Sequence, residues 1–143
     1  MNSNKIEYKK ELTTSFEKEI VAFLNRNEGG IVYIGIEESG SVIGIKEADR
    51  LLLQINDRMK NNILPSTEGL FDVLIETRRN KVIIKVTLVG GTEKPYYKKK
   101  LGMTEKGCFV RVGNISEPMP LEMIEELHAS STRNSTGKPL IKK

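Results

Sequence analysis

The stretch EGGIVYIGIEESGSVIGI, residues 28–45, carries the strongest structural signal in the sequence. It holds two apolar runs, 31–36 and 42–45, separated by a short connection that contains Ser39 and Gly40. Two β-rich segments joined in this way are typical of a β-hairpin. The first run does not alternate between apolar and polar residues, so both of its faces are expected to be covered. The pattern predicts a central hairpin in a β-sheet.

The remaining apolar spacing predicts an α/β (α+β) fold, in which a mixed sheet surrounds this hairpin and two to three helices flank it. A capping-box pattern at 14–17 marks the start of the first helix. Gly29 and Gly30 separate that helix from the central strand. The expected strands cover 5–12, 71–75, 82–88 and 108–112, and the expected helices begin near residues 16, 48 and 120.

A chain of 143 residues is long enough for one domain with its own core. We expect that domain to cover residues 1–130, followed over 131–143 by a flexible basic tail or a linker to a downstream domain. The sequence has no apolar run of about 18 residues and its polar start is not a signal peptide, so we expect a cytoplasmic protein without a membrane partner. The single cysteine, Cys108, lies in a strand pattern and is interpreted as a buried structural thiol.

The net charge of +4 suggests nucleic acid as a partner, but the tail carries all of this excess. Of the 23 Lys and Arg residues, four lie within 132–143, and the other 19 match the 19 acidic residues of the chain. The body of the protein is therefore expected to be neutral. A nucleic-acid surface would have to be a local patch of basic residues.

Charged residues in the first expected strand suggest one candidate site. Positions two apart in a strand share a face, which places Glu7, Lys9 and Glu11 together. Carboxylates beside a lysine suit a metal-dependent phosphodiesterase, because carboxylates bind Mg²⁺ or Mn²⁺. Glu37 or Glu38, at the end of the central strand, can add a further carboxylate. The alternative interpretation is a solvent-facing charged strand followed by a charged turn.

The segment 94–100 is basic and contains two tyrosines. Lysines neutralise phosphates and aromatic rings stack on bases, so this composition favours nucleic-acid binding, with Tyr96 or Tyr97 as the stacking residue. A solvated hairpin arm has the same composition. Arg111 can add a phosphate contact or pair with a carboxylate. The predicted nucleic-acid-binding residues are Arg78, Arg79, Lys94, Tyr96, Tyr97, Lys98, Lys99, Lys100 and Arg111.

Several blocks of the sequence occur in the order that is typical of one known family. They are Glu7-Tyr8-Lys9, Ala22-Phe23-Leu24-Asn25 with Gly29-Gly30, Ile34–Gly40 with Val42-Ile43-Gly44, Lys94-Pro95-Tyr96-Tyr97 and Phe109–Asn114. In this ordered set the sequence resembles the Schlafen AlbA_2 domain over about residues 5–128. The resemblance implies a compact α/β domain that binds DNA or RNA.

The resemblance also bears on catalysis. In some Schlafens a carboxylate triad of this domain cuts tRNA and rRNA, and two of its members match Glu7 and Glu38. The third position corresponds to Asn2, which is not acidic, and Glu11 is the nearby carboxylate that could replace it. The resemblance implies Glu7 and Glu38 as candidate catalytic residues and as ligands of Mg²⁺ or Mn²⁺ if the domain is a nuclease, and the shared strand face adds Lys9 to the catalytic candidates.

We predict a nucleic-acid-binding domain from the N-terminal part of a bacterial transcriptional regulator, with DNA or RNA as its partner and no cofactor. A metal-dependent endoribonuclease is one alternative, and the non-acidic Asn2 argues against it. A non-catalytic module that forms homodimers through exposed strands is the other alternative.

Overall fold

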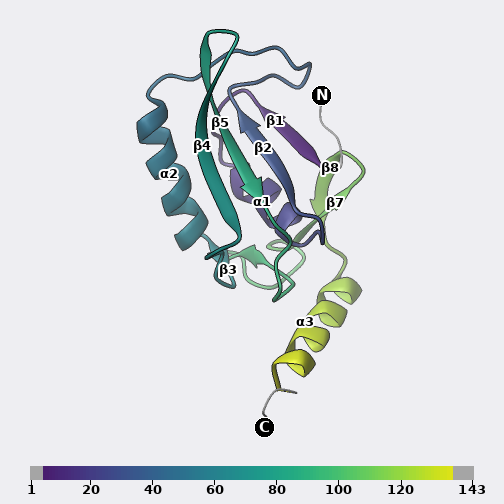
Figure 1. Ribbon diagram of the computed structural model, residues 1–143. Coiled ribbons are helices and arrows are strands. Elements are labelled where there is room, and N and C mark those ends of the chain that lie inside the picture. The colour runs from purple at the N-terminus through teal and green to yellow at the C-terminus, as the bar shows by residue number, and fades with distance from the viewer. Residues whose placement is uncertain (1–4, 137–143) are drawn as a thin grey trace.

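The computed structural model describes residues 5–136. Its main sheet has the strand order β1-β2-β5-β4, with β1 parallel to β2 and the other neighbours antiparallel. The pairs β3–β6 and β7–β8 form two small sheets. The helices are α1 (Phe16–Leu24), α2 (Ala48–Asn61) and α3 (Leu121–Thr136), and the strands are β1 (Ile6–Lys9), β2 (Gly30–Ile34), β3 (Ile63–Leu64), β4 (Phe71–Arg78), β5 (Lys81–Leu88), β6 (Tyr97–Lys98), β7 (Phe109–Val112) and β8 (Ile115–Pro118). This architecture confirms the predicted α+β class (Figure 1).

Helices α1 and α2 cover one face of the main sheet, and the core lies between them and the strands. Phe23 of α1 and Ile55 of α2 are fully buried in the same apolar cluster as Val32 of β2. Neighbouring strand residues point to the opposite face, where Tyr33 and Ile83 belong to a second cluster. Among the described residues, this second cluster is built from strands and loops alone. Figure 1 shows that face of the sheet in front of α1.

The predicted central hairpin is wrong, although β2 is a central strand. Strand β2 lies between β1 and β5, and its antiparallel partner is β5, about fifty residues further along the chain. The expected second strand of the hairpin meets the first in a single bridge, between Ile36 and Val42. Gly35 has a φ of +108°, a conformation that side chains disfavour, and the chain leaves the sheet at this glycine. Residues 35–47 therefore form an irregular loop at the end of β2.

The first strand and first helix differ from the prediction at their boundaries. Strand β1 ends at Lys9, and the N-cap of α1 is Ser15, whose side chain makes no capping hydrogen bond. The predicted capping box is therefore wrong. The carboxylate of Glu17 instead accepts hydrogen bonds from Arg58 and Asn62, because α2 packs beside the start of α1.

The glycine pair ahead of β2 has a steric role. Gly29 has a φ of +65°, and a Cβ there would overlap the carbonyl group of Leu88 on β5. A Cβ on Gly30 would overlap the ring of Phe23. The two glycines allow helix α1 and strand β5 to approach the same point of the backbone.

The last third of the described chain has a small apolar cluster of its own. Cys108 is fully buried with Met119 and Ile124, which confirms the prediction of a buried thiol; burial raises its pKa to about 11. Helix α3 projects from the body in Figure 1 and continues to Thr136, into the stretch expected to be a tail. The rest of that stretch, 137–143, lies outside the described residues. Within residues 5–136, no helix has the length and apolar character needed to span a membrane.

Candidate nucleic-acid interface

A cluster of four charged side chains joins β1, α1 and β7, and we call it the buried cluster because all but Lys9, which is 23% exposed, are buried. The guanidinium of Arg111 lies 2.8 Å from the carboxylate of Glu7 and 3.3 Å from that of Glu19. The ammonium of Lys9 lies 2.9 Å from Glu19 and 3.8 Å from Glu7. Ser116 donates a further hydrogen bond to Glu19. Two positive and two negative charges thus offset one another. Charges that are removed from water need such partners, because an unpaired buried charge is strongly destabilising.

This cluster corrects the role expected for Arg111. Its side chain is 1% exposed, and its guanidinium lies over the ring of Phe23, 4.6 Å from the centroid. A phosphate cannot reach a guanidinium that is enclosed in this way. Of the two roles that the sequence allowed, the structure gives Arg111 the second, a partner for carboxylates.

The cluster also decides how well Glu7 suits a metal ion. Burial and the neighbouring Glu19 raise the pKa of Glu7, and Arg111 and Lys9 oppose that rise. A Mg²⁺ or Mn²⁺ site needs several ionised oxygen ligands that converge on one point. The oxygens of Glu7 instead face two cations, while Glu38 is exposed on the loop after β2. Among residues 5–136, no group of three His, Cys, Asp or Glu side chains converges to hold a metal, and Asn2 lies outside that range. The residues present do not fit a catalytic metal.

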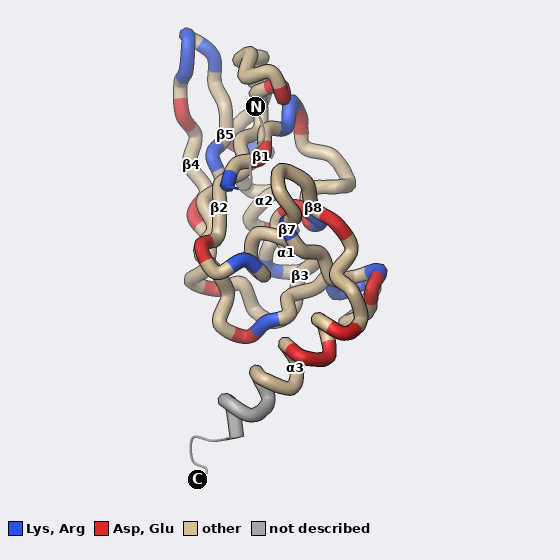
Figure 2. The backbone as a smooth tube through the Cα atoms, turned by 90° about the vertical axis from the view of Figure 1, so that its right-hand side faces the viewer, with Lys and Arg blue, Asp and Glu red and all other residues tan. Residues whose placement is uncertain are grey.

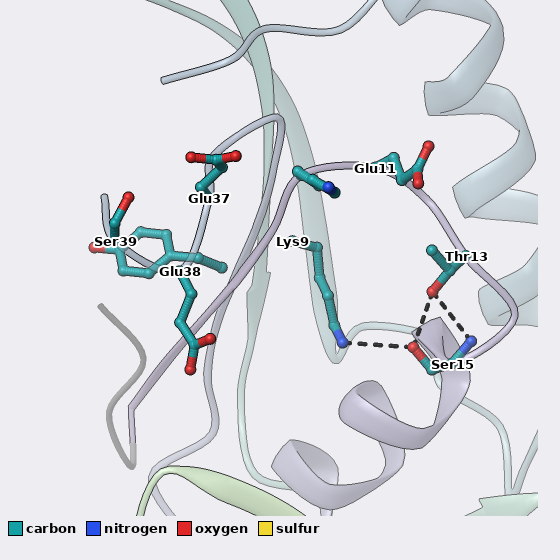
Figure 3. Close-up of a pocket in the computed structure, with 9 residues that line it drawn as sticks. Lys9, Glu11, Thr13, Ser15, Glu37, Glu38 and Ser39 are labelled. Carbon is teal, nitrogen blue, oxygen red and sulfur yellow. Dashed lines mark hydrogen bonds between the residues drawn. The ribbon is translucent and has the colours of Figure 1, made fainter. Parts of the chain in front are cut away.

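The structure does bring Lys9 and Glu38 together, in a surface hollow of about 740 Å³ at the end of β1. We call it the first hollow. Lys9 lies at its floor and donates a 3.4 Å hydrogen bond to Ser15, while Glu37 and Glu38 line the opposite wall (Figure 3). The remaining lining residues are Tyr8, Lys10, Glu11, Thr13, Ser15 and Ser39. Glu7 does not line the first hollow. The structure therefore does not bring Glu7 and Glu38, the two acids expected to share a metal, into one site.

Two further hollows continue from the first one. The second, of about 620 Å³, shares Lys10 and Glu11 with the first and also includes Lys46. The third, of about 600 Å³, shares Arg58 with the second and ends at the three lysines 98–100. Because neighbouring hollows share lining residues, they adjoin one another. We call the three adjoining hollows together the basic groove.

The basic groove carries a local excess of positive charge. Its Lys and Arg residues are Lys9, Lys10, Lys46, Arg58, Lys98, Lys99 and Lys100, and its acidic residues are Glu11, Glu17, Glu37 and Glu38. Burial alone would raise the pKa of Glu17, but hydrogen bonds from Arg58 and Asn62 outweigh it and hold that pKa below its ordinary value. Glu17 is therefore ionised and neutralises Arg58. The unopposed positive charge lies mainly at the end formed by Lys98–Lys100.

The segment 94–100 is not a solvated arm. The amide group of Asn25 donates to the carbonyl of Tyr96 at 3.1 Å and accepts from its backbone N–H at 2.7 Å. Tyr96 is 1% exposed, so its ring is part of the core and cannot stack on a base, contrary to prediction. The half-buried Tyr97 pairs with Leu64 of β3, and this pairing fixes the lysines that follow.

The other predicted basic residues lie apart from the basic groove and line none of its hollows. Lys94 donates a hydrogen bond of 2.6 Å to Asn27, and burial lowers its pKa. Arg78 and Arg79 lie at the tip of the β4–β5 hairpin, which Figure 2 shows as a basic end of the molecule. Sequence reasoning missed Lys10, Lys46 and Arg58, which come from three separate segments and carry no shared motif.

The comparison with protein-family models decides the family. The model described as Schlafen, AlbA_2 matches residues 2–120. The chain belongs to the Schlafen AlbA_2 family. The matched range includes every residue of the basic groove and the whole of the buried cluster.

Solved structures share the AlbA_2 fold with this chain. The crystal structure of the DIP2311 protein from Corynebacterium diphtheriae is 16% identical with a TM-score of 0.62, over 90% of this chain and 27% of that one. The solution structure of the N-terminal domain of a protein from Nitrosomonas europaea, named as related to the ATP-dependent DNA helicase RecG, is 20% identical with a TM-score of 0.53, over 82% of each chain. This AlbA_2 chain thus spans about a quarter of the Corynebacterium protein. No curated protein sequence matches it.

Proposed function

We propose that this AlbA_2 domain binds nucleic acid along the basic groove. The observation that carries the proposal is the gathering of seven basic side chains from separate parts of the sequence along these three adjoining hollows. Phosphate neutralisation by Lys and Arg is the main source of affinity for nucleic acids. The name of the Nitrosomonas relative, which refers to a DNA helicase, agrees with this choice of partner.

The lysines at 98–100 are the part of the basic groove that contributes most to binding. Strand β6 pairs with β3, and the backbone N–H of Lys99 donates to the carbonyl of Asn62. The three ammonium groups are therefore presented by an anchored turn, so that little backbone entropy is lost when a phosphate chain binds. Lys99 and Lys100 are exposed.

The proposal is tested by replacing Lys98, Lys99 and Lys100 together with alanine and measuring affinity for a DNA duplex and for single-stranded RNA. We expect affinity to fall about tenfold or more at physiological salt. The matched control replaces the exposed Lys60, Lys81 and Lys106, which line no part of the basic groove, and so removes the same charge. Equal losses in the two triple variants would mean that total charge matters and the groove does not.

The finer biological role is also a proposal. We infer that the domain serves a larger protein that regulates transcription. The length of the Corynebacterium relative supports the larger protein. Binding measured on the full gene product, with and without the AlbA_2 segment, tests whether this domain supplies the affinity for nucleic acid.

A further inference from the structure

The face of the main sheet that no described helix covers carries an ordered aromatic stack. The rings of Tyr8 and Tyr33, which are paired across β1 and β2, lie 5.6 Å apart with an interplanar angle of 16°. The guanidinium of Arg78 lies 4.6 Å from the centroid of Tyr33 and donates a hydrogen bond of 3.1 Å to its hydroxyl group. Strands β1 and β4 lie on opposite sides of β2. Tyr8 and Arg78 therefore flank Tyr33, which is 7% exposed.

The stack reaches the basic groove at Tyr8. This half-buried residue lies on β1, the edge strand of the sheet, and lines the first hollow together with Lys9, Lys10 and Glu38. Arg78 holds the ring of Tyr33 in place, and the Tyr8 ring stacks on it. The Tyr8 ring is therefore already ordered before a ligand binds. A pre-ordered aromatic ring loses little entropy on binding, which favours affinity.

The charge of the first hollow differs from that of the rest of the basic groove. Its three carboxylates, of Glu11, Glu37 and Glu38, outnumber its two ammonium groups. An excess of carboxylates disfavours a phosphate at this point. Carboxylates do accept hydrogen bonds from the amino groups of bases, as they do from cytosine. The first hollow therefore suits a nucleobase better than it suits the phosphate backbone.

We propose that Tyr8 is a stacking platform for an unpaired nucleobase, so that the preferred ligand of this domain is single-stranded nucleic acid. The backbone follows the lysines of the basic groove and a base at one end enters the first hollow, against the Tyr8 ring. A duplex, whose bases are stacked on one another, cannot present a base in this way. This inference rests on the proposed function, because it assigns the base-binding end of the same groove.

The test compares two single strands of about twelve nucleotides, oligodeoxycytidylate and an abasic strand with the same number of phosphates. Wild type should bind the base-bearing strand more tightly. Tyr8→Leu, which keeps apolar bulk but removes the ring, should lose about 5- to 150-fold of that affinity and bind the abasic strand as wild type does. Tyr8→Phe should bind both strands as wild type does. The dependence of affinity on salt should be the same in all three proteins, since no phosphate contact is lost.

A second readout keeps the test informative if Tyr8→Leu fails to fold. The chain contains no tryptophan, so Tyr8→Trp introduces a single indole at the proposed platform. Oligodeoxycytidylate should quench its fluorescence by stacking, and the abasic strand should leave it unchanged. Equal responses to the two strands would overturn the inference.

The outcomes separate this inference from the proposed function. If the Lys98–Lys100 triple variant loses affinity while Tyr8→Leu binds both strands like wild type, the groove stands and the platform is wrong. If wild type binds a DNA duplex but neither single strand, the platform is wrong and the groove stands. If it binds none of these ligands, both proposals fail. If Tyr8→Leu instead changes the oligomeric state measured by light scattering, with strand binding unaltered, the sheet face is a self-association surface and the platform is likewise wrong.

Discussion

The carboxylate of Glu7 lies 2.8 Å from the guanidinium of Arg111, and the two side chains are 8% and 1% exposed. The contact joins the edge strand β1 to β7, more than a hundred residues later in the chain. A carboxylate placed in this way serves to hold the fold together, and an arginine placed in this way is shielded from ligands.

The first prediction follows from that pair. Arg111→Met should lower the free energy of unfolding by about 3–5 kcal/mol, because it leaves Glu7 and Glu19 buried with Lys9 as their remaining cation. Urea denaturation of wild type and variant measures the difference. The control is Arg79→Met at the exposed hairpin tip, which should change stability by less than about 0.5 kcal/mol. Equal stabilities for Arg111→Met and wild type would show that the cluster is not structural.

The second prediction concerns acid stability. The pKa of Glu17 is lower in the folded protein than in the unfolded chain, so the unfolded state binds the proton more readily. The ionised carboxylate of Glu17 stabilises the fold above about pH 4.3, its pKa in the unfolded chain. This stabilisation is lost as the pH falls through the lower pKa of the folded protein. Glu17→Gln should therefore be less stable than wild type near neutral pH, by about 2 kcal/mol, and the difference should shrink on acidification. Melting curves between about pH 7 and pH 3 measure it, and a difference that grows toward low pH would contradict the assignment.

The third prediction concerns the glycines ahead of β2. Gly29→Ala and Gly30→Ala should each destabilise the protein by about 1 kcal/mol or more, since a Cβ at either position overlaps atoms of Leu88 or Phe23. Gly69→Ala is an informative control: its φ is +79° but nothing lies within 4 Å of an added Cβ, so it reports backbone strain alone. If Gly29→Ala and Gly30→Ala melt like wild type yet lose nucleic-acid binding, the pair belongs to a ligand loop.

The fourth prediction is that this domain shows little or no metal-dependent cleavage. Phosphodiester hydrolysis by metal ions needs several carboxylates around the ions, whereas Glu7 is held by Arg111 and Glu38 lies apart on an exposed loop. The assay is incubation with tRNA and with single-stranded DNA in Mn²⁺. Cleavage by wild type that Glu7→Gln or Glu38→Gln abolishes, in a variant that still folds, would establish a nuclease and contradict this prediction.

The sequence predicts the elements with local signals well. Apolar spacing identifies strands β4 and β5 and helix α2. The capping-box pattern fails because Glu17 finds a stronger partner in Arg58, from a helix that local reasoning does not place beside it. The central hairpin fails for a related reason: β2 pairs with β5, a strand much later in the chain that local reasoning does not place beside it.

The candidate site was predicted in part. Lys98, Lys99 and Lys100 stand out as a run and do line the basic groove, whereas Tyr96 in the same segment points into the core because Asn25 binds its backbone. Composition alone cannot distinguish an exposed from a buried aromatic residue in a short segment. Tyr8 had no individual signal, because its place in the stack depends on the register of β1 with β2.

The salt dependence of binding tests the central claim, that nucleic acid follows the basic groove, most directly. We would measure the slope of log K against log salt concentration on duplex DNA and on single-stranded RNA, for wild type, the Lys98–Lys100 triple variant and the Lys60, Lys81 and Lys106 control. Each lost phosphate contact should make the slope shallower by about 0.9 on duplex DNA and about 0.7 on a single strand. The account predicts a shallower slope for the groove variant alone. An unchanged slope for that variant on both ligands would contradict it.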